Sequence, residues 1–433
     1  MAYTYDITTS KKDNSANTCL FISHSILAIV DLFVSTFMVA HIYDLVSSTT
    51  QYIAVVGEYF MVMYLTMMIV YLASSYIIDR TNRVWAYRLS IIIETALVVL
   101  VAFKGSELGK LVWLAGMLYG ITHGLYYSSY NLIRQEMVSR TSISGYVTWI
   151  NVVSAIIKII VPTLMGAIIS VSTYSQIAIY MSRVCAIQFF VTFGIKSKRP
   201  ENSSFSLRGY FKKTRENKEF AQRINMIYMW SIIYGFTTTY GIIINICTML
   251  IFGTSMSLGI LTSVFSAVSV IALIIFNKFA KPGKRSGVMW VLSTFTVVGT
   301  VVFVAFPSVI TLVIYSILVA VARIIYQTVC DIHKNENFKE FGMYDEIAEH
   351  HAIIECLFCF VRAFAFGLIF VVGTFGNEFS FYILSIVYSL AAAAIFLINI
   401  VYEKKYCSKD LKENKTSDTI ETQTILGEIN ENN

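Results

Sequence analysis

Charged side chains are scarce in this sequence. Asp, Glu, Lys and Arg make up 14% of its 433 residues, against roughly a quarter in ordinary soluble domains. Proline is rarer still, with 4 residues, and there are only 22 glycines, which argues against a loop-rich or low-complexity chain. The 7 cysteines are scattered, and the Cys356-x-x-Cys359 pair has no second pair or histidine cluster beside it. We therefore expect buried, unreactive cysteines and neither a metal site nor redox chemistry.

Motifs for catalysis are missing as well. The chain has no phosphate-binding P-loop, no HExxH zinc motif, no GxSxG nucleophile elbow and no CxxCH haem-attachment motif. These absences argue against an enzyme and against an ATP-driven pump, and no cofactor is expected. The net charge of +6 would suggest a nucleic-acid partner only if its placement along the chain were ignored.

Hydrophobic residues are what the sequence has in excess, at 56% of the chain. A soluble protein could not cover that much apolar surface, whereas a lipid bilayer accepts it. A helix needs about 20 apolar residues to cross the ~30 Å hydrocarbon layer. Such runs lie at about 20–42, 58–78, 89–103, 111–133, 146–170, 175–195, 225–247, 257–277, 287–306, 308–330, 351–374 and 381–402. We therefore predict an all-α membrane protein with twelve transmembrane helices, for which the lipid bilayer is the first partner.

The basic residues lie almost entirely in alternate breaks between these runs. If both termini are cytoplasmic, 27 of the 33 Lys and Arg residues lie on the cytoplasmic side and 2 on the opposite side. This distribution follows the positive-inside rule, so no nucleic acid is needed to explain the charge. It predicts a multi-pass plasma-membrane protein with a cytoplasmic N-terminal segment at 1–19, a six-helix bundle at 20–195, a basic cytoplasmic linker at 196–224, a second six-helix bundle at 225–402 and a disordered cytoplasmic tail at 403–433.

The two halves of the chain carry weak echoes of each other. The Tyr-x-x-Tyr-Asn sequence at 127–131 in the fourth predicted span resembles the Arg-x-x-Tyr-Gln sequence at 323–327 in the tenth. Basic residues also follow both the second and the eighth predicted spans. Together with the basic linker between the six-span halves, these echoes predict an internal duplication that gives two pseudo-symmetric bundles.

The loop after the second predicted span carries a recognisable motif. Asp79, Arg80 and Arg83 occupy the charged positions of the pattern Gly-x-x-x-Asp-Arg-x-Gly-Arg-Arg, while Ser75 and Asn82 stand at its glycines. This pattern is the signature of the major facilitator superfamily between spans two and three, and the sequence resembles it there. The resemblance in topology extends over about residues 20–402. It implies a transporter made of two six-helix bundles that works by alternating access.

The same resemblance implies a gate. In the family, the arginines of this motif bridge to acids of the opposite half and hold the cytoplasmic side shut. The facing segment here would be the start of the eleventh predicted span, so the implied gate consists of Asp79, Arg80, Arg83, Glu346 and Glu349. The alternative is that these residues are solvated loop charges that only follow the positive-inside rule.

Ionisable residues inside the predicted spans are functional candidates, because charge at membrane depth is costly. The resemblance places spans 1, 4, 7 and 10 around a central cavity, with spans 2, 5, 8 and 11 beside them. Candidates for solute or ion contact on that arrangement are Asp31, His123, Tyr127, Tyr130, Asn131, Lys158, Arg323, Tyr326, Gln327, Glu355 and Arg362. Glu94 and Arg183 lie on outer spans, and for them a structural ion pair is expected instead of solute contact.

Asp31 is the leading candidate for ion coupling. A proton or Na⁺ could compete with Lys158 for its carboxylate, and the alternative is a constitutive Asp31–Lys158 pair that only satisfies both charges. The charges within the spans sum to a slight positive excess, which favours an anionic or strongly hydrogen-bonding solute. One departure from the family pattern matters: many of its proton-coupled exporters carry an arginine where the fourth span here has Gly116.

We therefore predict a secondary active transporter, a symporter or antiporter, that moves a small polar, anionic solute. It is expected to use an H⁺ or Na⁺ gradient and to act as a monomer. Two alternatives stay open at this point. One is an exporter of amphipathic compounds or a lipid flippase, and the other is a non-transporting receptor or assembly factor on the same scaffold.

Overall fold

The computed structural model describes residues 11–78, 82–137, 143–196, 205–279, 285–343 and 346–407. Within these ranges the chain is helical and contains no strand. The helices are α1 (Lys11–Leu32), α2 (Met38–Leu45), α3 (Thr49–Ile78), α4 (Arg83–Lys104), α5 (Leu108–Met137), α6 (Ile143–Val171), α7 (Tyr174–Val191), α8 (Leu207–Glu216), α9 (Lys218–Phe252), α10 (Ser255–Phe279), α11 (Arg285–Ala305), α12 (Val309–Glu340), α13 (Ile347–Phe375) and α14 (Glu378–Tyr402). A π-helical turn at Phe33–Phe37 joins α1 to α2, so that these two helices form one span.

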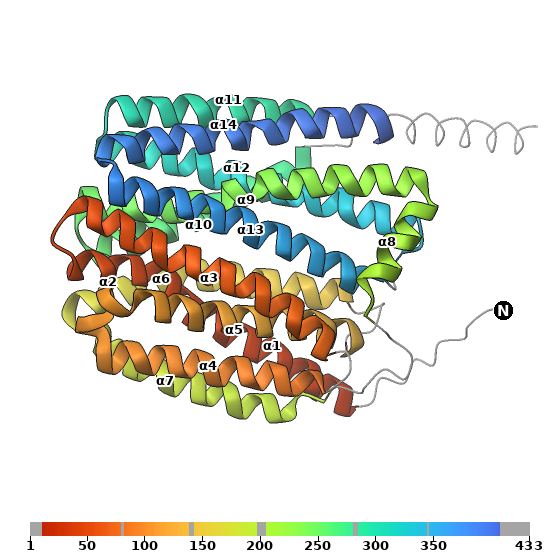
Figure 1. Cartoon of the computed structure of the whole chain (residues 1–433), viewed down its shortest axis with the longest axis horizontal. Helices are drawn as coiled ribbons and strands as arrows, with labels where there is room; N and C mark the ends of the chain where they lie inside the picture. The colour runs from red at the N-terminus through yellow and green to blue at the C-terminus, as the bar shows by residue number, and fades with distance from the viewer. Residues whose placement is uncertain are drawn as a thin grey trace, which may run out of the picture.

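The number of spans follows from the lengths of the helices. Eleven continuous helical stretches of the described chain are long and apolar enough to cross a bilayer. One of them, Arg83–Arg134, has 52 residues and contains both α4 and α5. A straight helix of that length would measure about 78 Å, more than twice the hydrocarbon thickness, whereas α4 and α5 lie side by side (Figure 1). The described chain therefore has twelve spans, as predicted, and α8 is too short to be one of them.

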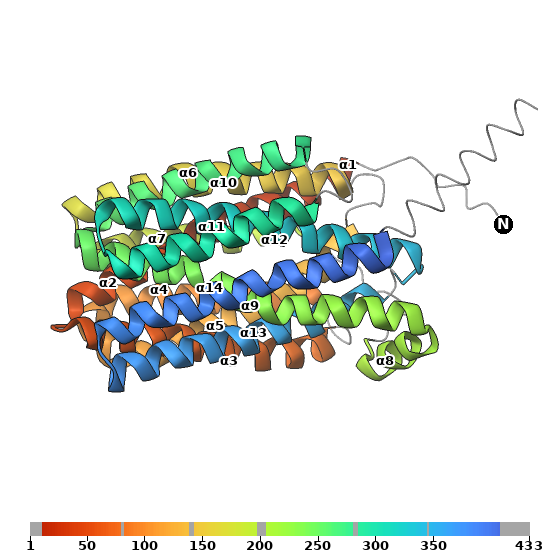
Figure 2. The ribbon, with the colours of Figure 1, turned by 90° about the horizontal axis from the view of Figure 1, so that it is seen from above.

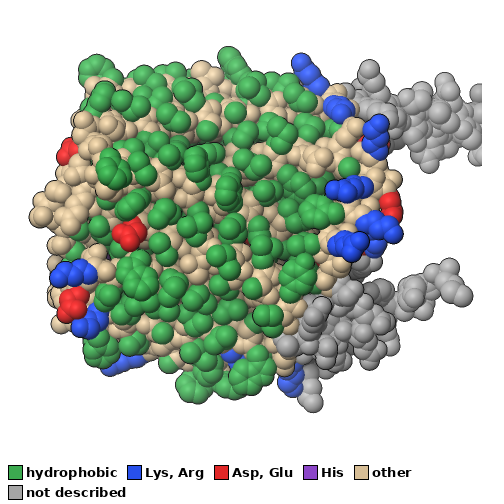
Figure 3. Space-filling model, in the orientation of Figure 1, with side chains coloured by type: hydrophobic (Ala, Val, Ile, Leu, Met, Phe, Trp, Pro, Cys, Tyr) green, Lys and Arg blue, Asp and Glu red, His purple; other side chains and the backbone are tan. Residues whose placement is uncertain are grey.

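The surface of the molecule matches a lipid environment. Apolar side chains cover the middle of the face in Figure 3, and Lys and Arg gather mainly at one end. Phe103 and Val171 are 78% and 86% exposed, which is unfavourable in water and natural against acyl chains. We call the end at which α1 begins and α14 ends the terminal end, and the opposite end the far end (Figure 1).

The helices form two groups that follow chain order. In the first half α3 packs on α5, α4 packs on α5 and α7, and α1 packs on α6 and α7. In the second half α9 packs on α12, α13 and α14, and α11 packs on α12 and α14. Helix α2 also packs on α9, and the two most extensive contacts between the halves are those of α3 with α13 and of α6 with α10 (Figures 1 and 2). These are spans two and eleven and spans five and eight, so an axis that exchanges the halves maps one pair onto the other.

The halves come closest near the far end, where glycines let backbones approach. A Cβ atom on Gly57 of α3 would lie 2.6 Å from the amide nitrogen of Phe370 in α13. A Cβ atom on Gly259 of α10 would lie 2.3 Å from the carbonyl oxygen of Pro162 in α6. Small residues at helix crossings are the usual device for close packing in membranes, where the hydrophobic effect does not drive helix association. Both crossings between the halves are therefore tightly closed on the far side of the molecule.

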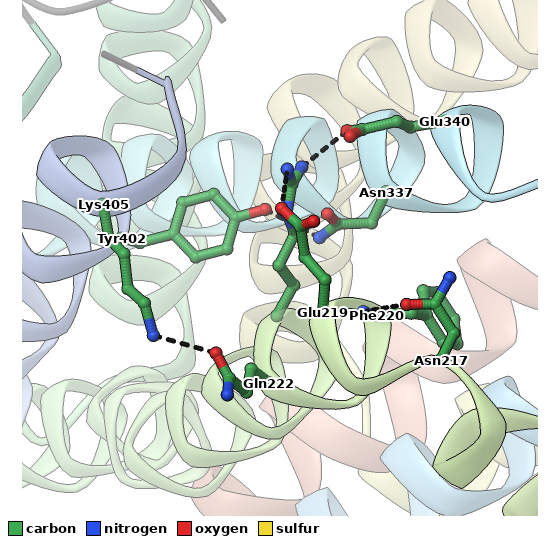
Figure 4. Close-up of polar contacts among 9 residues, drawn as sticks. Asn217, Glu219, Phe220, Gln222, Asn337, Glu340, Tyr402 and Lys405 are labelled. Atoms are coloured by element: carbon green, nitrogen blue, oxygen red, sulfur yellow. Dashed lines mark hydrogen bonds and ion pairs between the residues drawn. The ribbon is translucent and has the colours of Figure 1, made fainter. Parts of the chain in front are cut away.

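A polar network ties the second half together at the terminal end (Figure 4). Arg223 on α9 is 4% exposed, and its guanidinium contacts Glu219 at 2.8 Å and Glu340 of α12 at 2.5 Å. Asn337 of α12 donates to the hydroxyl of Tyr402 in α14 at 2.7 Å. Because these contacts join the ends of α9, α12 and α14, they favour movement of the second half as one unit.

The segment between the halves contains the amphipathic helix α8, at the terminal end (Figure 1). The side chain of Ser206 caps it by accepting the N–H of Gly209 at 3.0 Å. Tyr210 and Thr214 are buried while the basic side chains are exposed. Helix α9 begins at Lys218, inside the stretch for which the sequence predicted a linker, because charged residues are tolerated where a membrane helix extends into water.

Candidate functional site

Ionisable side chains from both halves meet near the middle of the spans. We call six of them the central polar cluster: Asp31 of α1, His123 of α5, Lys158 of α6, Arg323 of α12, and Glu355 and Arg362 of α13. The charge of Lys158 interacts with those of Asp31 and Arg323, and the charge of Glu355 interacts with those of Arg362 and His123. The structure thus places the six ionisable residues that the sequence proposed on spans of both halves, close enough for their charges to interact.

Asp31 has two partners on α5. Its carboxylate accepts a hydrogen bond from the hydroxyl of Tyr119, and its Oδ1 lies 3.0 Å from Nε2 of His123, an ion pair when the imidazole is protonated. The side chain of Asp31 is 35% exposed and that of His123 is 8% exposed, so water reaches the acid more easily than its partner. Lys158 makes no ion pair with Asp31 among the described residues, so the pair proposed from the sequence is replaced by a pair with His123.

The backbone beside Asp31 departs from α-helical geometry. The π-helical turn Phe33–Phe37 begins two residues after it, and such turns are frequent at functional sites. Tyrosine hydroxyls donate hydrogen bonds to two backbone carbonyl oxygens in this stretch. The carbonyl of Val34 accepts from the hydroxyl of Tyr59 at 2.8 Å, and the carbonyl of Phe33 accepts from the hydroxyl of Tyr174 at 2.7 Å. Helices α3 and α7 therefore hold the irregular part of the first span and fix the direction of Asp31.

Lys158 and Arg323 are the exposed cations of the cluster. Both side chains are solvent accessible although they lie within spans, and neither forms an ion pair within the described part of the chain. The guanidinium of Arg323 lies over Gly241 of α9, with Nη1 2.8 Å from the place of a Cβ atom. The two halves thus each contribute one exposed cation that has no ion-pair partner within the described part of the chain.

Arg362 is held by three helices. Its Nε donates to Oγ1 of Thr238 on α9 at 2.7 Å. Its guanidinium carbon lies 5.3 Å from the ring centre of Tyr64 on α3 and 5.1 Å from that of Phe358 on its own helix. Cation–π contacts of this kind stabilise a desolvated guanidinium. These contacts fix the position of the Arg362 guanidinium. Because Tyr64 belongs to α3 of the first half, Arg362 also connects the two halves.

Three of the uncharged residues that the sequence proposed lie next to the cluster. The ring of Tyr127 packs edge-on against His123, with centres 5.3 Å apart. Asn131 donates to the hydroxyl of Tyr71 on α3 at 3.5 Å, one turn further toward the terminal end. Gln327 is exposed one turn beyond Arg323, and its Oε1 accepts from the hydroxyl of Tyr234 on α9 at 3.1 Å.

Two tyrosines predicted for solute contact lie elsewhere. Tyr326 is buried against α11, where its hydroxyl and that of Ser293 are 2.6 Å apart. Tyr130 is buried against α1 and stacks on His24 with ring centres 4.5 Å apart. Both residues pack within their own half, so we omit them from the candidate site.

Several participants carried no sequence signal strong enough to be singled out. Tyr119, Tyr64 and Thr238 are ordinary residues for a membrane helix, and only their contacts reveal them. His24 lies two helical turns before Asp31 and accepts or donates at 2.8 Å to the hydroxyl of Tyr126. Its spacing of seven residues from Asp31 places both side chains on one face of α1, and this spacing could have identified it.

The model of the Major Facilitator Superfamily matches residues 19–342. The chain belongs to this superfamily. Membership makes it a multi-pass membrane protein, a secondary transporter and not an enzyme. No curated protein sequence matches it.

Solved structures of transporters share the fold of this transporter. The nucleoside transporter NupG has 11% identity and a TM-score of 0.63, with 91% of this chain and 99% of that chain covered. The xylose transporter XylE from E. coli has 12% identity and a TM-score of 0.63, with 89% and 98% covered. The human organic anion transporter TETRAN has 12% identity and a TM-score of 0.57, with 89% and 99% covered. At these identities the likeness concerns the fold alone.

The close packing of α5 on α3 explains why glycine stands at position 116. A Cβ atom there would lie 2.5 Å from the carbonyl oxygen of Tyr59 on α3, and one at Gly120 would lie 2.3 Å from that of Met63. Helix α5 packs on α3 through this glycine row, so this transporter has no room for the arginine that many exporters of the family carry at this position.

The implied gate is described only in part. Asp79 and Arg80 lie outside the described residues, and Arg83 is buried at the start of α4, where Asn82 caps the helix. Glu346 forms an ion pair with Lys213 of α8, and Glu349 accepts the N–H of Ser206 at 3.0 Å. Both acids at the start of α13 therefore contact the segment that connects the halves.

Glu94 and Arg183 do not form the structural pair that the sequence predicted. Glu94 is fully buried in α4, and neither of its carboxylate oxygens has a hydrogen-bond partner among the described residues. Arg183 is exposed on α7, with its guanidinium carbon 5.5 Å from the ring centre of Tyr180. The two residues belong to neighbouring helices, but the side chain of Glu94 is buried and that of Arg183 is exposed.

Proposed function

We propose that this transporter moves a small polar, anionic solute by alternating access and couples the movement to an H⁺ or Na⁺ gradient. The observation that carries the proposal is the pair Lys158 and Arg323, exposed cations from opposite halves without an acidic partner in the described chain. A charge inside a span is retained only where it is needed, because it is expensive there. The organic anion transporter TETRAN has the same fold, which is compatible with an anionic solute.

Asp31 is our candidate for the coupling carboxylate. It is accessible to water, it lies beside a histidine that can hold a proton, and a π-helical turn follows it. Proton or Na⁺ binding at Asp31 would weaken its attraction for His123 and change the field at Lys158. The cluster therefore offers a direct electrostatic connection between ion binding and solute binding.

Alternating access is supported by the unequal closure of the two ends. Backbones of opposite halves touch near the far end, at the crossings of Gly57 and Gly259. Gln327, one turn beyond Arg323 toward the terminal end of α12, is instead exposed. We propose that the terminal end closes when Glu346 and Glu349 leave the α8 segment and pair with the basic loop after α3.

The test is uptake by purified protein in proteoliposomes. A panel of carboxylates, phosphate esters, nucleosides, sugars and amphipathic drugs would be offered with and without a pH or Na⁺ gradient. We expect accumulation of an anionic member of the panel that depends on one of the gradients. Uptake restricted to amphipathic drugs, or binding without uptake of any compound, would contradict the proposal and favour an exporter or a receptor.

A further inference from the structure

We propose that two copies of this transporter form a symmetric dimer in the membrane, in which Arg183 of each copy pairs with Glu58 of the other. The sequence led us to expect a monomer instead, with Arg183 in an ion pair inside its own copy. The dimer would use the exposed side chains of α3, α4 and α7, which we call the α3–α4–α7 surface. The inference goes beyond the proposed function, because this surface lies outside the central polar cluster.

Arg183 is a cation on the lipid-facing side of α7. It is exposed, and so are Tyr180 and Ile187, which lie one turn before and one turn after it. Its guanidinium carbon lies 5.5 Å from the ring centre of Tyr180, and the residue forms no ion pair within the described part of the chain. A charge inside a span is costly, and most such charges face the interior of the bundle. An arginine that faces lipid therefore lacks an explanation in a single copy.

Glu58 is the corresponding anion on α3, and it is the only acid of that helix. It is partly exposed and lies on the same face as Leu65 and Ile69, two exposed residues seven and eleven positions further along the helix. Among the described residues it forms neither an ion pair nor a hydrogen bond. The lipid-facing side of the first half thus carries one unpaired charge of each sign.

The two charges lie at the same depth in the membrane. Helices α3 and α7 both begin at the far end (Figure 1), and Glu58 and Arg183 each lie nine residues after the first residue of their helix. Each also follows an exposed glutamine, Gln51 or Gln176, by seven residues, or about 10 Å of helix. A twofold axis along the membrane normal preserves depth, so residues of two copies can pair across it only when their depths match. Glu58 and Arg183 meet this condition.

Within one copy, other helices separate the two residues. Helix α3 packs on α5, α5 on α4 and α4 on α7, and α4 lies between α3 and α7 in both views (Figures 1 and 2). The exposed side chains of α4 recur at alternating intervals of four and three residues. They form one apolar stripe along the helix, made of Trp85, Leu89, Ile92, Ala96, Val99 and Phe103.

A twofold axis beside α4 would bring all of these features into contact. The apolar stripes of the two α4 helices would face each other, and α3 of each copy would lie opposite α7 of the other. The interface closes on itself, because both copies use the same surface and each contributes one arginine and one glutamate. A guanidinium can hold a carboxylate through two parallel N–H donors, so both charges would be satisfied twice over in each dimer. All three helices belong to the first half, which leaves the second halves free to move.

The test measures self-association of the full chain in lipid. Copies labelled at the N-terminus with a donor or an acceptor dye are reconstituted into phosphatidylcholine vesicles, and energy transfer is recorded as the protein-to-lipid ratio is lowered. We expect transfer that fits a monomer–dimer equilibrium and is reversed by dilution with lipid. No solute and no ion gradient is present, so the result does not depend on the proposed function.

Charge reversal tests the assigned pair. Arg183→Glu and Glu58→Arg should each raise the dissociation constant of the dimer at least roughly tenfold, because each variant replaces two attractive pairs by two repulsive ones. The variant with both substitutions should restore the dimer, since the pairs form again with their signs exchanged. Arg183→Gln, which adds no repulsion, should weaken the dimer less than Arg183→Glu.

A matched control is Lys278→Glu, which reverses an exposed cation at the end of α10 in the second half and should leave the dissociation constant unchanged. The unfolding temperature of each variant, followed by tryptophan fluorescence, separates weaker association from loss of folding. If Arg183→Glu does not fold, Arg183→Gln provides the measurement in its place.

Three results would overturn the assignment. They are monomers at every protein-to-lipid ratio, dimers that neither single reversal nor Arg183→Gln weakens, and a folded double variant that stays as monomeric as the single ones. Monomers in pure lipid would leave the α3–α4–α7 surface to lipid or to the helix of a different protein. None of these results would affect alternating-access transport, which is measured separately by uptake.

Discussion

The ion pair between Asp31 and His123 allows a sharp test of coupling. At 3.0 Å, two unit charges attract each other by about 5 kcal/mol at an effective dielectric constant of roughly 20. The net value is smaller, because the side chain of Asp31 is 35% exposed and His123 must be protonated for the pair to exist. Asp31→Asn keeps an oxygen for the hydroxyl of Tyr119 and removes only the charge. We therefore expect a loss of roughly 1.5–3 kcal/mol in stability, the usual contribution of a hydrogen bond to a charged group.

The functional consequence is separable from the loss of stability. Without the carboxylate, Asp31→Asn should still exchange solute in counterflow but should no longer accumulate it against a gradient. Both quantities are measured in the same proteoliposomes with an imposed pH or Na⁺ gradient. Glu94→Gln is the control for the carboxyl-to-amide change itself, since it makes the same exchange at a buried residue of the same half that lies outside the cluster. Undiminished gradient-driven accumulation by Asp31→Asn would refute the coupling role of this residue.

Three further substitutions test the architecture. Gly57→Val places a side chain 2.6 Å from the backbone of Phe370, so it should reduce transport more than tenfold in a folded protein, while Gly109→Val, whose Cβ meets nothing within 4 Å, should leave the rate of uptake unchanged. Tyr326→Phe loses the hydroxyl contact to α11 and should cost about 1 kcal/mol of stability without altering solute affinity; a weakened affinity would return Tyr326 to the site. Arg223→Gln should lower the unfolding temperature, with a loss of roughly 1.5–3 kcal/mol, and normal stability would show that the network in Figure 4 is dispensable.

The number of spans and the placement of the basic residues could be predicted from the sequence. Both depend on local composition, which can be read along the chain without knowing how the helices pack. Twenty apolar residues span a bilayer whatever their neighbours are, and basic loops report their side of the membrane in the same additive way. The π-helical turn at Phe33–Phe37 could not be predicted, because it depends on hydroxyl donors from α3 and α7. Helix α8 was missed because its ten residues are too polar for a span and its burial depends on docking.

The sequence predicted which residues belong to the candidate site, but it did not predict how their side chains pair. Ionisable residues inside spans are rare, so each one can be recognised in the sequence as a functional candidate. The six residues of the central polar cluster were found in this way. Pairing depends on how each helix is rotated, which the sequence does not give. Consecutive residues on a helix point about 100° apart, so Gln327 faces the cluster while Tyr326 packs against α11. For the same reason His123, and not Lys158, is the partner of Asp31.

The contacts at the start of α13 have the strength that a reversible gate requires. Lys213, which pairs with Glu346, has a side chain that is 58% exposed, and such partly solvated ion pairs contribute about 0–1 kcal/mol. Glu349 accepts the N–H of Ser206 at 3.0 Å. A transporter must keep its two states within a few kcal/mol of each other, because a ligand can shift the balance only by its difference in affinity for them. A partly solvated pair such as Lys213–Glu346 meets this condition, whereas a fully buried pair at this position would lock one state.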